Sequence, residues 1–220
     1  MALSDKRILE EKKKGNIVIE PFDERNLATS SYDVSLGEWY FRERRQNFDV
    51  YNPFNKDQTD KVWGIKPHRA ELAKRILKDF EFKGIKPTDK IILISPGETI
   101  LAHTEQFIGG KNQITTMMKA RSSMGRNFIE VCKCAGWGDV GFFNRWTMEI
   151  TNNSRFYTIP LVVSRRIAQI VFFHVGPILK DDYAHQGKYQ NTKMLNKMKR
   201  KWNPTSMLPK LYKDREIKEK

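Results

Sequence analysis

Cysteine is scarce in this sequence, and long hydrophobic runs are missing from it. The 220 residues include only two cysteines, Cys132 and Cys134, which would share one face of a strand and could not bridge without distortion. The sequence therefore excludes a disulfide framework, and we expect both thiols to be reduced. There is no apolar run of about 18 residues and no apolar signal core near the start. We accordingly expect a soluble, cytoplasmic protein with no membrane association.

Acidic residues are also much less frequent than basic ones. The chain has 26 Asp and Glu against 40 Lys and Arg, a formal net charge of +14, which favours a polyanionic partner such as nucleic acid or a phosphorylated small molecule. Residues 188–220 hold eleven Lys and Arg against three Asp and Glu, so they carry eight of these charges. The simplest interpretation is one folded domain with a solvated, partly mobile basic tail.

The pattern of apolar residues predicts a mainly β protein with short helices. Helices are expected over residues 4–14 and 70–79, and an irregular excursion over 40–70. The strands expected from β-branched runs between Gly, Pro and Asn turns are 17–21, 31–37, 91–94, 99–103, 114–118, 146–151, 158–163 and 168–175. No alternation of strands with helices is visible, which excludes Rossmann and TIM arrangements and indicates a barrel or sandwich.

Two arginines and two serines form a compact basic cluster: Arg121, Ser122, Ser123 and Arg126. Arginine forks match phosphate oxygens, and serine hydroxyls with nearby N–H groups complete an anion cradle. The cluster therefore predicts a phosphate site. The alternative is a serine that caps a helix beside solvated arginines.

A glycine-rich turn follows at residues 136–141, with Asp139 at its bend. Glycines let main-chain groups approach a ligand closely, so this loop could recognise a nucleobase edge. The alternative is an ordinary hairpin with an Asx turn.

Glu149 lies in an alternating strand in which Trp146, Met148 and Ile150 share one face, and Thr147 and Glu149 share the other. If this second face lines a covered pocket, the carboxyl is desolvated, its pKa rises and it can act as general base and acid. If the face is open to water, Glu149 is only a polar strand residue.

Two other chemistries are disfavoured. His103 and Glu105 have the H-x-E form of zinc deaminases, but the P-C-x-x-C half of that signature is absent, and Cys132 and Cys134 on one strand give poor tetrahedral geometry. We expect no metal ligands in the protein. The tail has no known nucleic-acid-binding signature, so contact with nucleic acid would be weak and nonspecific.

Motifs follow one another along residues 3–192, at 3–6, 15–24, 31–37, 96–102, 120–126, 135–142, 147–149, 166–172 and 186–190. Together they resemble the dCTP deaminase family of the dUTPase superfamily. The resemblance implies a distorted jelly-roll β-barrel, dUTPase-like, over residues 1–192, in which an arm at about 181–192 closes over the nucleotide. It also implies a homotrimer with sites between subunits, and Mg²⁺ bound with the triphosphate. Residues 193–220 remain as the basic C-terminal tail.

The resemblance also assigns roles to site residues. Glu149 would take a proton from the water that attacks C4 of cytosine, with Ser122 and the carbonyl of Ala135 positioning that water. Arg126 would support the carboxylate and base, and Asp139 would contact the 3′-hydroxyl. The remaining nucleotide-binding residues would be Arg121, Ser123, Thr147, Met148, Tyr183, Lys188 and Gln190.

The activity implied is deamination of dCTP, or of a related cytosine deoxynucleotide, to dUTP and ammonia. Alternatives are a bifunctional enzyme that continues to dUMP and pyrophosphate, a plain dUTPase, and an inactive trimer that binds nucleotide or nucleic acid. Gly138, Val140 and Thr192 depart from the family pattern, as do Cys132 and Cys134, so the substrate is the least defined part of this expectation.

Overall fold

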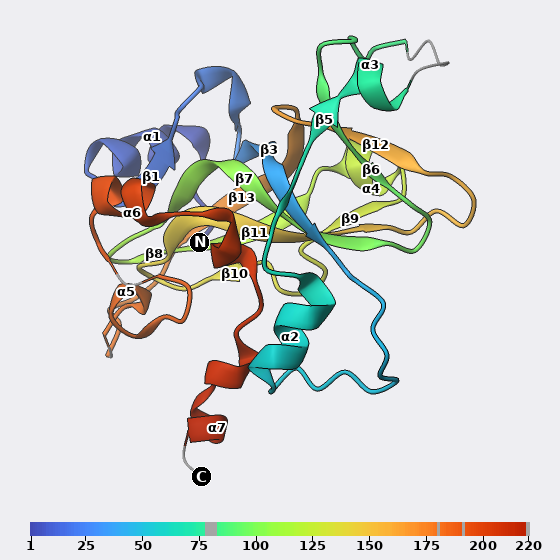
Figure 1. The fold of residues 1–220 in the computed structure, drawn as a ribbon. Coiled ribbons are helices and arrows are strands. Elements are labelled where there is room, and N and C mark those ends of the chain that lie inside the picture. The colour runs from blue at the N-terminus through green and yellow to red at the C-terminus, as the bar shows by residue number, and fades with distance from the viewer. Residues whose placement is uncertain (78–82, 180, 191, 219–220) are drawn as a thin grey trace.

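The computed structural model describes residues 1–77, 83–179, 181–190 and 192–218 (Figure 1). More of these residues belong to strands than to helices, and the helices are short. The helices are α1 (Asp5–Lys13), η1 (Glu24–Asn26), α2 (Lys56–Trp63), α3 (Ala73–Ile76), α4 (Ser122–Gly125), α5 (Tyr183–Gln186), α6 (Leu195–Lys201), η2 (Pro204–Met207), η3 (Leu211–Lys213) and α7 (Arg215–Lys218). The fold is thus mainly β, as predicted.

The strands form one large curled sheet and a small one, all antiparallel. The large sheet runs β10 (Trp137–Gly138), β8 (Ile114–Ala120), β13 (Arg166–His174), β3 (Ser31–Arg42), β7 (Thr99–Gly110), β11 (Phe143–Asn152) and β9 (Ile129–Val131). Three short strands join this path: β1 (Ile17–Glu20), β2 (Leu27–Ala28) and β4 (His68–Arg69). The small sheet contains β12 (Ile159–Val162), β6 (Lys90–Ile94) and β5 (Glu71–Leu72). This is the predicted distorted jelly-roll barrel.

Strand β3 connects the two halves of the curled sheet. Its first part, from Tyr32, pairs with β13, and its second part, to Arg42, pairs with β7. The register is irregular between Leu36 and Tyr40, where Gly37 lies. A glycine at such a bend lets the strand turn from one half of the barrel to the other.

The predicted opening helix and all the predicted strands are confirmed, with shifted ends. Strand β7 extends through Gly109 and Gly110, which the sequence suggests as a turn. The reason is close backbone approach, since a Cβ on Gly109 would lie 2.0 Å from the carbonyl oxygen of Phe142. The helix expected over 70–79 is reduced to α3, because its first residues pair in the small sheet; residues 78 and 79 lie outside the described part. Helix α2 within the excursion was missed.

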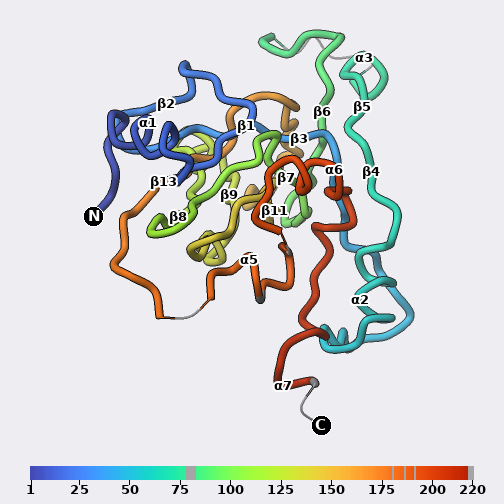
Figure 2. Tube along the Cα trace, turned by 90° about the vertical axis from the view of Figure 1, so that its left-hand side faces the viewer, coloured from blue at the N-terminus to red at the C-terminus, as the bar shows by residue number. Residues whose placement is uncertain are grey.

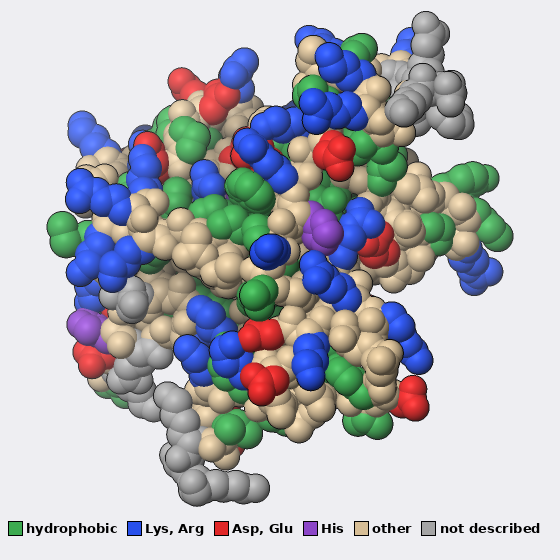
Figure 3. Space-filling model, in the orientation of Figure 1, with side chains coloured by type: hydrophobic (Ala, Val, Ile, Leu, Met, Phe, Trp, Pro, Cys, Tyr) green, Lys and Arg blue, Asp and Glu red, His purple; other side chains and the backbone are tan. Residues whose placement is uncertain are grey.

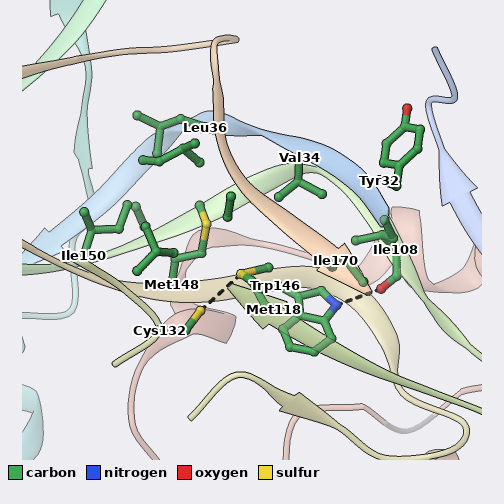
Figure 4. Close-up of a cluster of buried hydrophobic side chains, with 14 of the residues drawn as sticks. Tyr32, Val34, Leu36, Ile108, Met118, Cys132, Trp146, Met148, Ile150 and Ile170 are labelled. Carbon is green, nitrogen blue, oxygen red and sulfur yellow. Dashed lines mark hydrogen bonds between the residues drawn. The ribbon is translucent and has the colours of Figure 1, made fainter. Parts of the chain in front are cut away.

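The alternation of core-facing and outward-facing side chains predicted around Glu149 is present in β11. Trp146, Met148 and Ile150 are all buried, and the indole N–H of Trp146 donates to the carbonyl of Ile108 at 2.8 Å (Figure 4). The buried thiol of Cys132 lies 3.1 Å from the sulfur of Met118. These contacts fix β11 in register, so its other face is directed away from the core.

The C-terminal segment, residues 193–218, has many exposed side chains but is attached to the sheet at buried methionines, so the expectation of a solvated, mobile tail is only partly met. Met198 is buried with Val18, Phe107 and Phe143. Met207 is buried with Phe41 and Leu101. Figures 1 and 2 both show the segment crossing β7 and β11 and then running beside α2. Its apolar side chains cover part of the sheet, and its charged ones face outward.

Basic side chains crowd one region of the surface. Figure 3 shows Lys and Arg spread over this face and dense where α1 and α6 lie. Both helices end in basic residues, Lys12 and Lys13 in α1 and Lys199, Arg200 and Lys201 in α6. No helix in the described part of the chain has the length and apolar character needed to cross a membrane.

Candidate active site

A cavity of about 360 Å³ lies where β11, the glycine-rich hairpin, the predicted closing arm and the C-terminal segment meet. It gathers five of the residues singled out from the sequence: Ala135, Asp139, Thr147, Glu149 and Tyr183. The other lining residues are Leu101, Trp137, Gly138, Phe142, Asn144, Arg145, Trp146, Tyr189, Trp202, Ser206, Met207 and Pro209. Aromatic rings form much of the cavity wall, and its charged side chains are Asp139, Arg145 and Glu149, a mixture of apolar surface and a few polar groups that is typical of small-molecule sites.

Glu149 is held at the cavity wall by the sheet on both sides. Its strand pairs with Leu101 of β7, and its carbonyl accepts the N–H of Cys132 at 2.9 Å. Burial raises the pKa of its carboxyl above the usual value, and the positive charge of Lys133 opposes that rise only in part. A carboxyl with a raised pKa is a stronger base when ionised than a solvated glutamate, which is what general acid–base chemistry requires.

Strand alternation separates the neighbours of Glu149. Thr147 faces the cavity, whereas the side chain of Met148 is buried in the core. A ligand in this cavity could therefore reach Met148 only through its backbone, which limits the binding role expected for that residue. The alternation in the sequence already indicated that Met148 shares the core face with Trp146 and Ile150.

The hairpin that carries Ala135 and Asp139 is fixed by close backbone contacts. The Met118 N–H donates to the carbonyl of Gly136 at 2.7 Å, and a Cβ on Gly136 would lie 2.3 Å from the Met118 carbonyl oxygen. At the other end, Gly141 has a positive φ of +93°. The hairpin therefore needs glycine at both positions, and it presents its main chain and the Asp139 carboxylate toward the cavity.

The predicted closing arm lies against this hairpin. The Tyr183 N–H donates to the carbonyl of Val140 at 2.9 Å. The buried amide of Gln190 accepts the N–H of Phe143 at 2.9 Å and donates to the carbonyl of Gly141 at 2.8 Å. Gln190 thus attaches the arm to the hairpin and is not among the residues that line the cavity.

Lys188 lines an adjoining cavity of about 710 Å³. The two cavities share Trp137, Asp139 and Tyr183. The ammonium of Lys188 is paired with the carboxylate of Asp214 in the C-terminal segment. One continuous ligand could lie in both cavities, with its anionic end near Lys188.

The basic cluster does not reach Glu149 within this chain. Ser122, Ser123 and Arg126 are exposed on and after α4. Arg121 lines a separate, basic cleft of about 890 Å³ with Arg166. Both guanidinium groups contact Asp33, Arg121 at 3.2 Å and Arg166 at 2.9 Å. The structure therefore divides the predicted residues between two surfaces of the chain.

Sequence reasoning missed the contribution of the C-terminal segment to the cavity. Trp202 lies between His103, with ring centroids 4.7 Å apart, and Arg145, whose Cζ is 4.6 Å from the indole centroid. Leu195, Met198 and Trp202 are spaced three and four residues apart, which is the pattern of an amphipathic helix. That spacing was the available signal, and the high charge of the segment obscured it.

The described residues offer no group of three or more His, Cys, Asp and Glu side chains arranged to hold a metal ion. The Nδ1 of His103 contacts the carbonyl of Thr104 at 2.8 Å, and its Nε2 accepts the N–H of Trp39 at 3.3 Å. Both ring nitrogens are therefore occupied within the fold.

Comparison with known proteins identifies relatives along most of the chain. A family description, dCTP deaminase-like, matches residues 2–175. A protein of Nanoarchaeum equitans named dCTP deaminase, dUMP-forming, is 30% identical over 193 residues, which cover 88% of this chain and 94% of the relative. A protein of the same name from a Hydrogenobaculum species is 34% identical over 181 residues, covering 81% of this chain and 85% of the relative.

The fold is also similar to a solved structure, the 2′-deoxycytidine 5′-triphosphate deaminase from Agrobacterium tumefaciens, with a TM-score of 0.54. The two sequences are 16% identical, and the match covers 80% of this chain and 48% of that chain, about half its length. At this identity the likeness shows the jelly-roll fold alone.

Proposed function

The chain belongs to the dCTP deaminase-like family, and from that premise we propose that it hydrolyses the 4-amino group of dCTP, with Glu149 as general base and acid. The observation that carries the proposal is a half-buried carboxyl with a raised pKa, in one cavity with Ala135, Asp139 and Tyr183. The names of the two curated relatives supply the substrate.

The chemistry follows from the position of this carboxyl. Glu149 removes a proton from a water molecule as the oxygen attacks C4 of the cytosine ring. The proton passes to the ring nitrogen N3, a second proton moves to the amino group, and ammonia leaves as the C4 carbonyl forms. Each proton is carried by the same carboxyl, which explains why its pKa must be higher than that of a solvated glutamate.

The two adjoining cavities suggest how the nucleotide lies. We place the base beside Glu149 and Thr147, with the Ala135 carbonyl accepting a hydrogen bond from the attacking water. The deoxyribose lies over the shared wall, where Asp139 accepts a hydrogen bond from the 3′-hydroxyl. The phosphates extend toward Lys188, which must exchange its partner Asp214 for phosphate oxygens. Mg²⁺ would enter with the triphosphate, bound mainly by its oxygens.

The site would be completed by a second copy of the chain. Ser122, Ser123 and Arg126 are exposed, and none of them lines the cavity that contains Glu149, which is consistent with a role in the site of another subunit. We propose a homotrimer in which this basic cluster of one subunit closes the cavity of the next. In that arrangement Ser122 positions the water, Arg126 supports the Glu149 carboxylate, and Arg121 and Ser123 contact phosphate.

The product is proposed to be dUMP. The sequence resemblance favours dUTP as the product, but both curated relatives are named dUMP-forming. A second water would then split the bond between the α and β phosphates of dUTP and release pyrophosphate. Anion-exchange analysis of the products from dCTP decides this point, because dUMP forms only if that bond is cut.

The deamination step is tested with Glu149→Gln. We expect ammonia release from dCTP to fall by about 10²–10⁴-fold, the usual contribution of a general acid–base group, while dCTP still raises the melting temperature. Glu130→Gln is the matched control, because Glu130 lies on the neighbouring strand β9 and does not line the cavity. Unchanged ammonia release by Glu149→Gln would contradict the proposal.

A separate experiment tests whether each site contains residues from two subunits. Glu149→Gln and Ser122→Ala chains, each inactive alone, are mixed, unfolded and refolded together. If each site takes residues from two subunits, mixed trimers contain some sites with both native residues, and activity partly returns. A site built within one subunit would gain nothing from mixing.

A further inference from the structure

The C-terminal segment, residues 193–218, lies over the candidate active site. It supplies four residues to the cavity wall that also contains Glu149: Trp202, Ser206, Met207 and Pro209. The segment follows the last motif of the family resemblance, which ends near residue 192. Its contribution to the cavity is therefore additional to the residues that the family pattern assigns.

Two buried methionines hold the segment against the sheet. Helix α6 inserts Met198 among Val18, Phe107 and Phe143. After the Pro204–Met207 turn, Met207 packs on Phe41 and Leu101. Burial of two methionine side chains gives the segment a stable attachment on each side of Trp202.

Trp202 occupies the middle of the segment and contacts charged and aromatic partners. The Arg145 guanidinium lies 4.6 Å from its ring centroid and 5.1 Å from that of Phe107. The Nε atom of Arg145 is buried without a hydrogen-bond partner among the described residues. Stacking against two rings is thus the main interaction of this cation, and losing the indole would expose or displace it.

The same segment also contacts the closing arm. The Lys210 N–H donates to the hydroxyl of Tyr189 at 3.1 Å, and the Lys210 ammonium donates to the carbonyl of Lys188 at 3.2 Å. The Asp214 carboxylate also pairs with the Lys188 ammonium, but phosphate would replace that contact, so the two Lys210 hydrogen bonds are the ones that hold the arm when a nucleotide is bound. These contacts hold the arm at Lys188 and Tyr189, whereas the hairpin binds it through Gln190.

We propose that the C-terminal segment is a strap that holds the closing arm over the nucleotide cavity before the nucleotide binds, and that Trp202 is its positioning residue. An arm that is already ordered costs the nucleotide less conformational entropy on binding. The strap therefore strengthens substrate binding and contributes little to the chemical step. The identity of the nucleotide rests on the proposed function, whereas the holding of the arm does not.

The experiment compares the full-length wild type with Trp202→Ala, Trp202→Phe and Lys199→Ala. Trp202→Ala removes the ring between His103 and Arg145, and Trp202→Phe keeps an aromatic surface there. Lys199→Ala is the matched control, because it removes an exposed ion pair with Glu20 from the same segment, away from the cavity. Hydrogen exchange of the amides of residues 183–190 is measured without nucleotide, and KM and kcat are measured with dCTP.

For Trp202→Ala we expect faster exchange in the arm and a KM raised about tenfold, equivalent to about 1.4 kcal/mol, with kcat changed much less. Trp202→Phe should have arm exchange and a KM close to those of the wild type, and Lys199→Ala should match the wild type in both. Unchanged arm exchange in a folded Trp202→Ala protein would overturn the proposal, as would a fall in kcat at constant KM. If wild type releases no ammonia from dCTP, the proposed function fails, and arm exchange still decides the role of the strap.

If Trp202→Ala does not fold, Trp202→Leu carries the test on its own, since an aliphatic side chain keeps apolar volume there but cannot stack on Arg145. Intermediate arm exchange and an intermediate KM would then support the strap. Wild-type values of both would overturn it.

Discussion

The imidazole of His103 fills the space directly above Gly37, at the bend where β3 leaves one half of the barrel for the other. A Cβ built on Gly37 would lie 2.0 Å from the Cε1 atom of the ring. His103 in turn packs against Trp202, so the bend supports the sheet on which the C-terminal segment rests. Because Gly37 has no Cβ, the His103 ring can pack against the bend of β3 and also contact Trp202 in the wall of the candidate site.

Gly37→Ala should destabilise the protein by about 1–3 kcal/mol, the usual cost of inserting an atom into a filled space. The imidazole is buried and has hydrogen bonds at both nitrogens, so it cannot move away without losing them. Denaturant unfolding measures the change. Gly176→Ala is the control, because nothing lies within 4 Å of a Cβ there. Equal stability of the two variants would show that the ring can shift freely.

His103 should remain neutral well below the ordinary histidine range. Burial lowers its pKa from 6.5 to about 4, and the positive charge of Arg145 acts in the same direction. Between these two values the unfolded chain binds more protons than the folded one, so stability is complete above pH 6.5 and is lost as the pH falls toward 4. The full loss is about 3 kcal/mol, at about 1.4 kcal/mol per pKa unit.

The titration of His103 can be followed by NMR through its ring Cε1–H resonance, assigned with a His103→Gln variant. The expected result is no chemical-shift midpoint above pH 5. A midpoint near pH 6.5 would mean that the ring is open to solvent, and both the Gly37 contact and the Trp202 contact would then need revision.

Asn152 should be among the most sensitive polar residues of the fold. Its buried side chain donates to the carbonyls of Ile94 at 2.9 Å and Tyr157 at 2.8 Å, and it accepts the N–H of Ser154 at 2.9 Å. Asn152→Ala leaves these groups without partners and should cost about 3 kcal/mol, since each unsatisfied buried group costs about 1–3 kcal/mol. Urea unfolding of this variant beside Asn153→Ala tests it, because Asn153 is exposed and makes one 3.3 Å contact with Glu130; similar losses in both would contradict the prediction.

The sequence predicted the local parts of the candidate site because they depend on short-range rules. Strand alternation placed Glu149 and Met148 on opposite faces of the sheet, and the glycine spacing placed Asp139 on a hairpin. The relation of Ser122 to Glu149 could not be derived in this way, since the two lie on different surfaces of one chain. Nothing in the local pattern of either residue describes the proposed association of copies.

The errors in the sequence reading have a different origin. The C-terminal segment was expected to be solvated because charge dominates its composition, yet Met198, Trp202 and Met207 are enough to attach it to the sheet. Helix α2 was missed because its Asn55 N-cap is surrounded by residues typical of loops. In both segments a few apolar contacts with distant strands outweigh composition, and such contacts are not visible in a window of neighbouring residues.

Glu149→Gln should make the protein more stable at neutral pH while it removes activity. Burial raises the pKa of the carboxyl above its ordinary value of 4.5. The folded protein therefore keeps this proton where the unfolded chain has lost it, so the native state binds more protons and the free energy of unfolding falls as the pH rises above 4.5. The glutamine side chain of the variant does not titrate, so the variant does not lose this part of the free energy of unfolding as the pH rises.

Thermal unfolding from pH 4 to pH 8 measures the effect. Wild type and Glu149→Gln should have similar melting temperatures near pH 4, and the variant should gain as the pH rises, by about 2–4 °C for each kcal/mol recovered in a chain of this size. Glu130→Gln should follow the wild type across the range. If Glu149→Gln instead lost stability as the pH rose, the carboxylate would be favourably solvated or paired in the folded state. A residue in that setting would hold its proton too weakly for the role proposed here, because the same desolvation that destabilises the charged form makes Glu149 a base of useful strength.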